Sequence, residues 1–331
     1  QKDQNKKIGA LMHYAKPPIM LSDVIADTPQ VHELLRQNAP YTPLGGWFRP
    51  QQGQQEPTSP MWFQNDWVHG DIAVPGADLF MLHEEVTAAA REFYEAEVVI
   101  PHTLYVNLMA CLAESGPAHT DNPLFEGRDR TNTPMWLLRT MLWSGLFEDW
   151  TIRQATSIWW MNDVDGGGLL YWPDGPASPP QRHCENMTNT ALLGDNHGMF
   201  HQVEPVGPFD QGTRLVSASA ELAPEDDGSG DWAVRDHGKI AYRAPLEDFR
   251  ISVLWKAHIY RDQQEQEQRQ ANPLSLEQVA RIFADDLAAK GSSLRLDIED
   301  LDNPEQAMAI AAVYPEAIPV DVGRSIFDAL M

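Results

Sequence analysis

The sequence predicts a mainly β protein with flanking α-helices, built around an antiparallel sandwich of jelly-roll type. Between residues 98 and 262, short apolar runs bounded by turn residues recur at intervals that suit antiparallel strands rather than alternating βαβ units. Helical periodicity is confined mainly to the segments before and after this region. We therefore expect a single domain over 1–331, with N-terminal helical support in 1–97, the jelly-roll core in 98–262 and C-terminal helices in 263–331.

Two amphipathic segments predict helices in the N-terminal part. One begins at Ser22-Asp23 and runs to about Asn38, and a stronger one covers 76–97. The intervening residues 40–60 are rich in Pro, Gly and Gln, which is typical of an exposed connection.

The predicted core consists of short strands separated by turns. A strand-like run covers 104–112 and turns at Gly116-Pro117, whereas 136–143 fits either a helix or a buried strand. The polar stretch 263–270 reads as a linker, and helices are expected over 275–290 and 304–312. The further strand candidates are 152–161, 169–172, 190–193, 200–206, 215–222, 232–234, 239–243 and 250–260.

Charge and composition exclude several classes of partner. The chain has 24 Lys and Arg against 48 Asp and Glu, a net charge of -24 that repels phosphate backbones and anionic lipids. No run approaches the roughly 18 apolar residues of a membrane helix. The two cysteines, Cys111 and Cys184, are typical of an intracellular chain. We expect a cytoplasmic protein that binds a small-molecule substrate, not nucleic acid or a membrane, either alone or as a homodimer.

Histidines followed two positions later by an acid are the strongest chemical signal. Three such pairs occur: His83/Glu85, His119/Asp121 and His183/Glu185. Positions i and i+2 of a helix point about 200° apart, so His83 is assigned to a solvated helix face. His183 lies in a proline-rich loop that would not aim two ligands. His119 and Asp121 lie in extended chain, where i and i+2 project to one side and can chelate a metal.

A third ligand must come from a distant segment. His197 falls in a polar turn, whereas His201 begins a predicted strand and is therefore preferred. Two imidazoles and one carboxylate with open positions form the facial arrangement associated with non-haem iron(II) oxygenases. The alternative is that His119 and Asp121 form a surface pair and that His201 is a core histidine.

These residues resemble the iron(II)- and 2-oxoglutarate-dependent oxygenases, a superfamily whose ligands form an H-x-D…H triad on a double-stranded β-helix, the cupin-like jelly roll. His119-Thr120-Asp121 and, 80 positions on, His201-Gln-Val-Glu-Pro-Val are similar to its ligand segments. Tyr105-Val106-Asn107-Leu108 is similar to the strand before H-x-D, and 167–173 is similar to the G-G-x-L hairpin between the ligands. The resemblance covers about residues 98–262 and indicates no subfamily.

The resemblance implies an arginine that binds the distal carboxylate of 2-oxoglutarate, and two candidates compete. Arg214 lies 13 positions after His201, near the usual spacing, whereas Arg250 lies 49 positions after it and requires an inserted hairpin. Strand parity favours Arg250, because Arg250 and Ser252 project to the same face of one strand. We choose Arg250 and Ser252, supported by Tyr105 and Asn107 from the neighbouring strand.

The implied cofactors are Fe(II), 2-oxoglutarate and O2. The implied reaction is oxidation of a C–H bond of a small molecule, with release of succinate and CO2. Family members that halogenate usually lack the carboxylate ligand, so Asp121 indicates hydroxylation, desaturation or cyclisation. Two alternatives stay open: a cupin-like metalloenzyme that does not use 2-oxoglutarate, and a non-catalytic jelly-roll binding protein.

Overall fold

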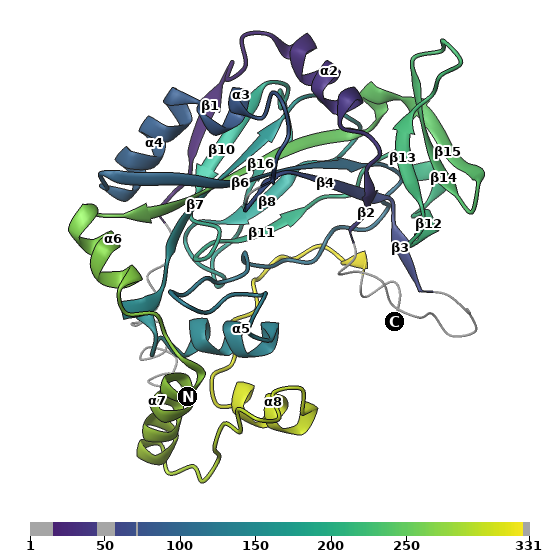
Figure 1. Cartoon of the computed structure of the whole chain (residues 1–331). Coiled ribbons are helices and arrows are strands. Elements are labelled where there is room, and N and C mark those ends of the chain that lie inside the picture. Colours follow the sequence, from purple (N-terminus) through teal and green to yellow (C-terminus); the bar gives the residue numbers. More distant parts are fainter. Residues whose placement is uncertain (1–15, 45–56, 71, 327–331) are drawn as a thin grey trace.

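The computed structural model describes residues 16–44, 57–70 and 72–326, and it confirms a mainly β architecture with flanking helices (Figure 1). Its largest sheet has eight antiparallel strands in the order β1-β10-β7-β16-β6-β4-β2, with β5 paired to β4. The strands of this sheet are β1 (Ile19–Ser22), β2 (Thr42–Pro43), β4 (Trp62–His69), β5 (Ile72–Ala73), β6 (Val98–Met109), β7 (Arg153–Trp160), β10 (Thr190–Gly194) and β16 (Arg250–Tyr260).

A smaller sheet lies against the largest one and completes the jelly roll. Its three strands, in the order β11-β8-β9, are β8 (Leu169–Trp172), β9 (Gln181–His183) and β11 (Phe200–Val203). The chain at His119 extends this sheet through a bridge to His201 on β11. The expected sandwich is therefore confirmed, with strands from distant parts of the sequence interleaved in each sheet.

The central strand β16 separates two environments because its sequence alternates. Its odd-numbered residues from Ile251 to Ile259 are apolar and fully buried in the main hydrophobic core. Its even-numbered residues, which include Arg250, Ser252 and Lys256, lie on the opposite face, where Arg250 bonds to the turn before β8 and Lys256 bonds to Asp121. The face of the large sheet toward the smaller sheet therefore carries buried polar groups beside a second hydrophobic cluster, whereas its outer face is apolar.

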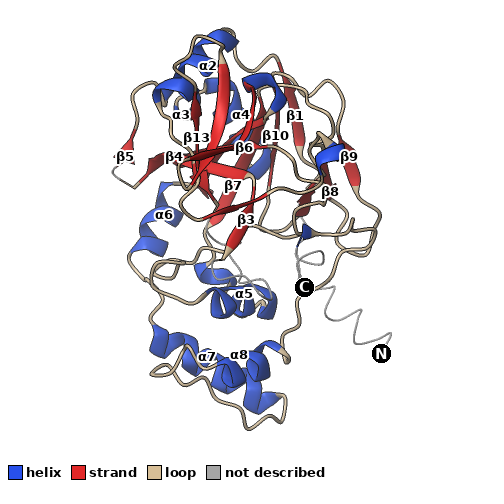
Figure 2. Cartoon of the chain, turned by 90° about the vertical axis from the view of Figure 1, so that its right-hand side faces the viewer, coloured by secondary structure: helices blue, strands red, loops and turns tan. Residues whose placement is uncertain are grey.

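Helices from the N-terminal part cover that outer face (Figures 1 and 2). They are α2 (Thr28–Gln37), α3 (Asp78–Met81) and α4 (Glu84–Tyr94). Phe80, Val86, Ala90 and Phe93 join the core beside the strands. The prediction of helical support in 1–97 was incomplete, because β4 and four shorter strands also lie there. The predicted helix over 76–97 is also broken in two, and His83 caps the second half by accepting a hydrogen bond from the Val86 amide.

A second small sheet fills the interval between β11 and β16. Its strands β13 (Glu221–Pro224), β14 (Asp231–Asp236) and β15 (Lys239–Pro245) form an antiparallel meander, and the short β12 (Leu215–Ser217) pairs instead with β3 (Thr58–Pro60). This is the inserted hairpin that the choice of Arg250 required. It explains the long spacing between the distal histidine segment and β16.

A separate helical cluster lies below the sheets in Figure 2. It combines α5 (Met135–Ser144), which follows the first ligand segment, with α7 (Leu276–Ala289) and α8 (Pro304–Ala311). Phe147, Phe283 and Tyr314 stack within its apolar centre. The open question over 136–143 is therefore decided in favour of a helix.

The predicted linker 263–270 is wrong, because the structure has α6 (Gln263–Gln270) there. Asp262 caps this helix by accepting a hydrogen bond from the Glu265 amide. Arg269 pairs with Glu265 one turn earlier and donates to the carbonyls of Asp149 and Thr151. Side-chain capping and pairing thus stabilise a helix that has no apolar face.

The last described segment, 320–326, crosses the smaller sheet on the side opposite to the ligands. The buried Gln202 side chain donates to the carbonyls of Gly116 and Gly323 and accepts from the Gly323 amide. Ile326 is fully buried in the second hydrophobic cluster, and its amide bonds to the Ser115 carbonyl. The segment therefore ties the ligand-bearing β11 to the chain before His119. None of the helices in the described ranges has the length and apolar character needed to traverse a bilayer.

Candidate metal centre

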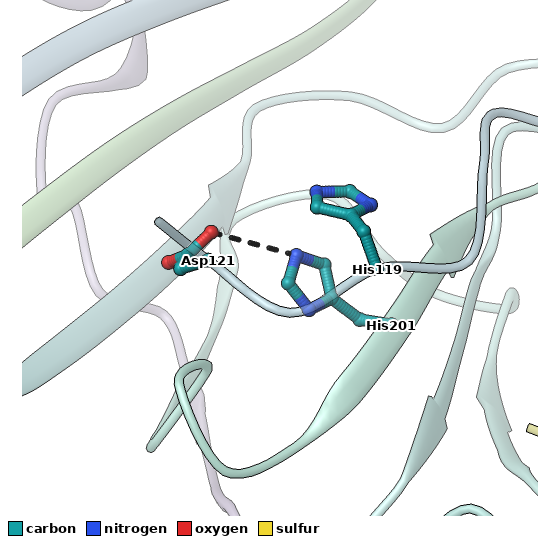
Figure 3. A group of neighbouring side chains, drawn as sticks. All are labelled: His119, Asp121 and His201. Atoms are coloured by element: carbon teal, nitrogen blue, oxygen red, sulfur yellow. Dashed lines mark ion pairs between the residues drawn. The ribbon is translucent and has the colours of Figure 1, made fainter. Parts of the chain in front are cut away.

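The two histidines of the triad lie opposite each other on paired backbone (Figure 3). The His119 amide donates to the His201 carbonyl at 3.0 Å, and the reverse bond measures 2.9 Å. In each ring Nδ1 faces a backbone carbonyl, that of Pro117 at 2.8 Å for His119 and that of Met199 at 3.2 Å for His201. Such contacts fix the tautomer with the proton on Nδ1 and leave Nε2 as a metal ligand.

The third member, Asp121, is aligned by its own backbone. Its amide donates to the Asn196 carbonyl at 2.8 Å, and its Oδ1 lies 3.7 Å from Nε2 of His201. One ligand atom from each of the three residues falls within 4.8 Å of the others, and within the described ranges no other cluster of three such residues meets this criterion. Ligand atoms 2.0–2.2 Å from one ion lie at most about 4.4 Å apart, so the 3.7 Å between Asp121 Oδ1 and His201 Nε2 is short enough for both to bind one ion.

Electrostatics favour the protonation states that a metal requires. Burial lowers the pKa of His119 below its usual value and lowers that of His201 to about 4, so both rings are neutral at pH 7. Burial alone would raise the pKa of the Asp121 carboxyl, but Lys256, His201 and His197 together outweigh it and hold this pKa well below its usual range. The site thus offers two neutral imidazoles and one carboxylate.

Two residues that contact Asp121 were not predicted. Lys256 Nζ lies 2.8 Å from Asp121 Oδ2, and Thr156 Oγ1 donates to the same oxygen at 3.1 Å. Burial would lower the pKa of Lys256, but Asp121 and Tyr105 together outweigh it and raise this pKa to about 12. Strand parity could have revealed Lys256, because it shares the even-numbered face of β16 with Arg250 and Ser252.

Arg250 occupies the interior at the other end of β16. It is only 3% exposed, donates from Nε to the Gly167 carbonyl at 2.7 Å and donates from NH1 to Ser252 Oγ at 2.9 Å. Burial lowers its pKa to about 10, and it forms no ion pair with the residues that the structure describes. A buried guanidinium without a carboxylate partner is costly unless an anion joins it. The G-G-x-L segment predicted from the sequence contacts this arginine through Gly167.

Of the two supporting residues expected from the sequence, Asn107 lies beside Ser252, whereas Tyr105 lies next to Lys256. Asn107 is paired with Ser252 across the β6–β16 ladder, and its buried Oδ1 has no hydrogen-bond partner. Nε1 of Trp160, whose ring faces the Arg250 guanidinium at 6.0 Å, is also without a partner. Tyr105 is two positions further along β6, where Lys256 Nζ lies 5.8 Å from its ring. Unsatisfied buried polar atoms around Arg250 are what a site for a polar, anionic group should show.

The rejected candidates lie elsewhere or have other partners. Arg214 is exposed and donates to the Ala241 carbonyl of the inserted sheet. His83 was wrongly assigned to a solvated face, because its Nε2 donates to the Val24 carbonyl at 2.6 Å and its ring packs edge-to-face against Trp159. His183 belongs to strand β9 rather than to a loop, and it contacts Thr190 and Trp160. His197 is buried near Asp121 but is not in the triad.

The donor set fits an iron(II) ion and 2-oxoglutarate. Two imidazole nitrogens and one carboxylate oxygen suit iron(II), and Arg250 with Ser252 suits a carboxylate. The chain therefore resembles the iron(II)- and 2-oxoglutarate-dependent oxygenases both in its jelly-roll topology and in its His-x-Asp…His triad.

Comparison with known proteins gives similarity to solved structures alone. No protein-family model matches the chain, and no curated protein matches it in sequence. One similar structure is an oxidoreductase of the 2OG-Fe(II) oxygenase family from Burkholderia pseudomallei, at 11% identity, TM-score 0.39 and coverage of 74% of this chain and 86% of that one. Another is HygX from Streptomyces hygroscopicus with nickel, 2-oxoglutarate and hygromycin B bound, at 10% identity, TM-score 0.38 and coverage of 78% and 87%. A prolyl hydroxylase from Trichoplax adhaerens, in complex with a hypoxia inducible factor peptide, is similar at 10% identity, TM-score 0.37 and coverage of 82% and 96%.

Proposed function

We propose that the chain is a non-haem iron(II)- and 2-oxoglutarate-dependent dioxygenase that oxidises a C–H bond of a small molecule. The observation that carries this proposal is the placement of both required sites in one interior. His119, Asp121 and His201 converge at one end, and the unpaired Arg250 guanidinium lies on the same face of the large sheet. A metalloenzyme that does not use 2-oxoglutarate would need the triad but not a buried arginine without a carboxylate.

The proposed roles follow from the contacts of each residue. His119, Asp121 and His201 hold iron(II), with the rings oriented by the Pro117 and Met199 carbonyls. Arg250 and Ser252 hold the distal carboxylate of 2-oxoglutarate, and Asn107 and Tyr105 contact it along β6. When bound, the iron and 2-oxoglutarate supply O2 activation and the oxidation, which yields succinate and CO2 as by-products.

The residues of the chain contribute binding, orientation and exclusion of water. Asp121 and His201 are less than a tenth exposed, and Arg250 is almost fully buried. Burial strengthens the ionic contact between a guanidinium and the carboxylate of 2-oxoglutarate. Because Asp121 supplies the carboxylate ligand, we propose hydroxylation, desaturation or cyclisation as the outcome rather than halogenation.

The proposal is tested by adding 2-oxoglutarate to anaerobic, iron-loaded protein and recording the visible spectrum. A metal-to-ligand charge-transfer band is expected for the wild type and for His197→Ala. No band is expected for His201→Ala, because the distal ligand is lost. Iron binding without a band would favour the metalloenzyme that does without 2-oxoglutarate, and retention of iron by His201→Ala but not by His197→Ala would overturn the choice of distal ligand.

Turnover is tested with 2-oxoglutarate, ascorbate and O2 and a panel of small molecules. Succinate should form slowly without substrate and faster with a true substrate. The product mass should show one added oxygen or the loss of two hydrogens. Chlorine in the product of the wild-type protein would contradict the assigned role of Asp121, and a protein that retains no iron after purification would favour a non-catalytic binding protein.

A further inference from the structure

The two carboxylate oxygens of Asp121 have different surroundings. Oδ2 accepts hydrogen bonds from Lys256 Nζ at 2.8 Å and from Thr156 Oγ1 at 3.1 Å. Oδ1 accepts no hydrogen bond from the described part of the chain, and its near neighbour is Nε2 of His201 at 3.7 Å. The carboxylate is therefore held by one oxygen and free at the other.

The donors of Oδ2 are rigidly placed. Thr156 and Lys256 are directly paired residues of the adjacent strands β7 and β16 in the centre of the large sheet. Thr156 is 1% exposed, and the Lys256 side chain is 14% exposed. Strand pairing fixes both backbones, so the hydroxyl and the ammonium approach the carboxylate from one side.

We propose that Lys256 and Thr156 are positioning residues that reserve Oδ2 of Asp121 for hydrogen bonds, so that only Oδ1 is presented to a metal ion. The inference rests on the proposed iron site. It identifies two residues outside the triad that determine whether Asp121 coordinates the metal ion through one oxygen or through two.

The number of protein ligand atoms matters for the proposed chemistry. An octahedral ion has six positions, and the two imidazoles with one carboxylate oxygen use three of them. A chelating 2-oxoglutarate would use two more, which leaves one for O2. If Asp121 used both oxygens, no position would remain for O2 beside the chelated cosubstrate. Blocking Oδ2 therefore keeps that position open.

A spectroscopic test does not depend on activity. We would record difference infrared spectra of zinc-loaded minus metal-free protein labelled with 13C-aspartate. The separation between the asymmetric and symmetric carboxylate stretches is wide for coordination through one oxygen and narrow for coordination through two. The wild type should give the wide separation. The double variant K256M/T156V should give the narrow separation. The single variants T156S and K256R, which keep the hydroxyl and the cation respectively, should give the wide separation of the wild type.

Nitric oxide is a suitable second probe because it occupies the position that O2 would take. In the anaerobic iron complex with 2-oxoglutarate, the S = 3/2 signal of the adduct should require at least tenfold more nitric oxide in K256M/T156V than in the wild type. Lys239→Met, which changes an exposed lysine of β15, is the matched control and should behave as the wild type. If the double variant does not fold, the nearly isosteric T156V alone should show a narrow component in the infrared spectrum.

A wide separation in K256M/T156V, or in T156V where only that variant folds, would overturn the proposal. So would a narrow separation in the wild type. Failure of 2-oxoglutarate to give a charge-transfer band would contradict the proposed function alone, because the infrared measurement uses zinc and needs no cosubstrate.

Discussion

At the scale of single residues, the most informative side chain is Arg250, whose guanidinium is buried without a carboxylate partner among the described residues. Arg250→Leu should raise the apparent 2-oxoglutarate constant about a hundredfold, because loss of one partner of a buried ionic contact costs on the order of 2–5 kcal/mol. Arg214→Leu should change the constant less than threefold, since Arg214 is exposed and bonds to the Ala241 carbonyl. Titration of the charge-transfer band measures both constants, and the reverse ranking would show that strand parity chose the wrong arginine.

Sequence patterns predicted much of this site because strand parity is local. Arg250 and Ser252 are two residues apart, so the period of the strand alone places them on one face. His201 was preferred over His197 because it begins a predicted strand, but the pairing of His119 with His201, about 80 residues apart, has no local signal in the sequence. The contact of Lys256 with Asp121 was missed for the same reason, and the helix break at His83 was missed because a histidine ring acts as the cap.

At the scale of elements, the paired strands β6 and β16 bring the rings of two histidines into contact. One of them, His258, lies two residues after Lys256 on β16. The rings of His102 and His258 have centroids 3.8 Å apart, and His102 Nε2 lies 3.0 Å from the Gln154 amide nitrogen. Burial lowers the pKa of His102 to about 3, with His258 and Lys256 adding to the effect, and burial together with His197 lowers the pKa of His258 to about 4. Neither ring accepts a proton readily in the folded state.

These shifts predict acid sensitivity of the metal-free protein. An unfolded histidine has a pKa near 6.5, so below that pH the unfolded state binds protons that the folded state excludes. The free energy of unfolding should be greatest above about pH 6.5 and should fall toward pH 4, by up to about 1.4 kcal/mol per pH unit for each such histidine. His258→Gln should flatten this slope by about one proton. Urea unfolding in the presence of a chelator, between pH 4.5 and 7.5, gives the slope, and an unchanged slope would argue against the pair as its source.

The helical cluster of α5, α7 and α8 should respond to a large-to-small change. Phe283 is fully buried, with its ring centroid 5.1 Å from that of Phe147 and 5.3 Å from that of Tyr314. Phe283→Ala should lower the free energy of unfolding by about 3–5 kcal/mol, because it removes apolar burial and leaves a cavity. Met308→Ala on α8 is the control, since Met308 is 66% exposed and its loss should cost less than about 0.5 kcal/mol. Equal effects of the two changes in denaturant unfolding would contradict this packing.

The elements that sequence patterns missed lack the regular apolar periodicity on which the predictions depend, for a different reason in each. The strand β4 has a bulge between Asp66 and Val68, so the neighbours Trp67 and Val68 are both buried and the alternation that marks a strand is lost. The helix α6 has no apolar face and is stabilised by capping and side-chain pairs. By contrast, β16 alternates without interruption in sequence, and its predicted bounds agree with the structure.

At the scale of the whole molecule, segment 320–326 links the ligand strand β11 to the chain before His119. Gln202→Leu should leave the Gly116 carbonyl and the Gly323 amide without partners, which costs about 1–3 kcal/mol for each buried group. We expect a loss of about 2–4 kcal/mol and faster hydrogen exchange at the amides of Gly323 and Ile326. Gln264→Leu on the exposed face of α6 is the control. Unchanged exchange at Gly323 would show that Gln202 does not hold the segment.

The same crossing segment sets an order of events during synthesis. The ribosome makes the two ligands at positions 119 and 121 first and the distal histidine 80 residues later, but residue 326 follows His201 by roughly 125 residues. At about 5–20 residues per second, this interval lasts roughly 6–25 s. During it, β11 can bond directly to Gly116 and His119, but the further bonds that Gly323 makes to Gln202 and Ile326 makes to Ser115 are not yet available. The nascent chain therefore carries all three candidate ligands for several seconds before segment 320–326 can support the strand that bears His201.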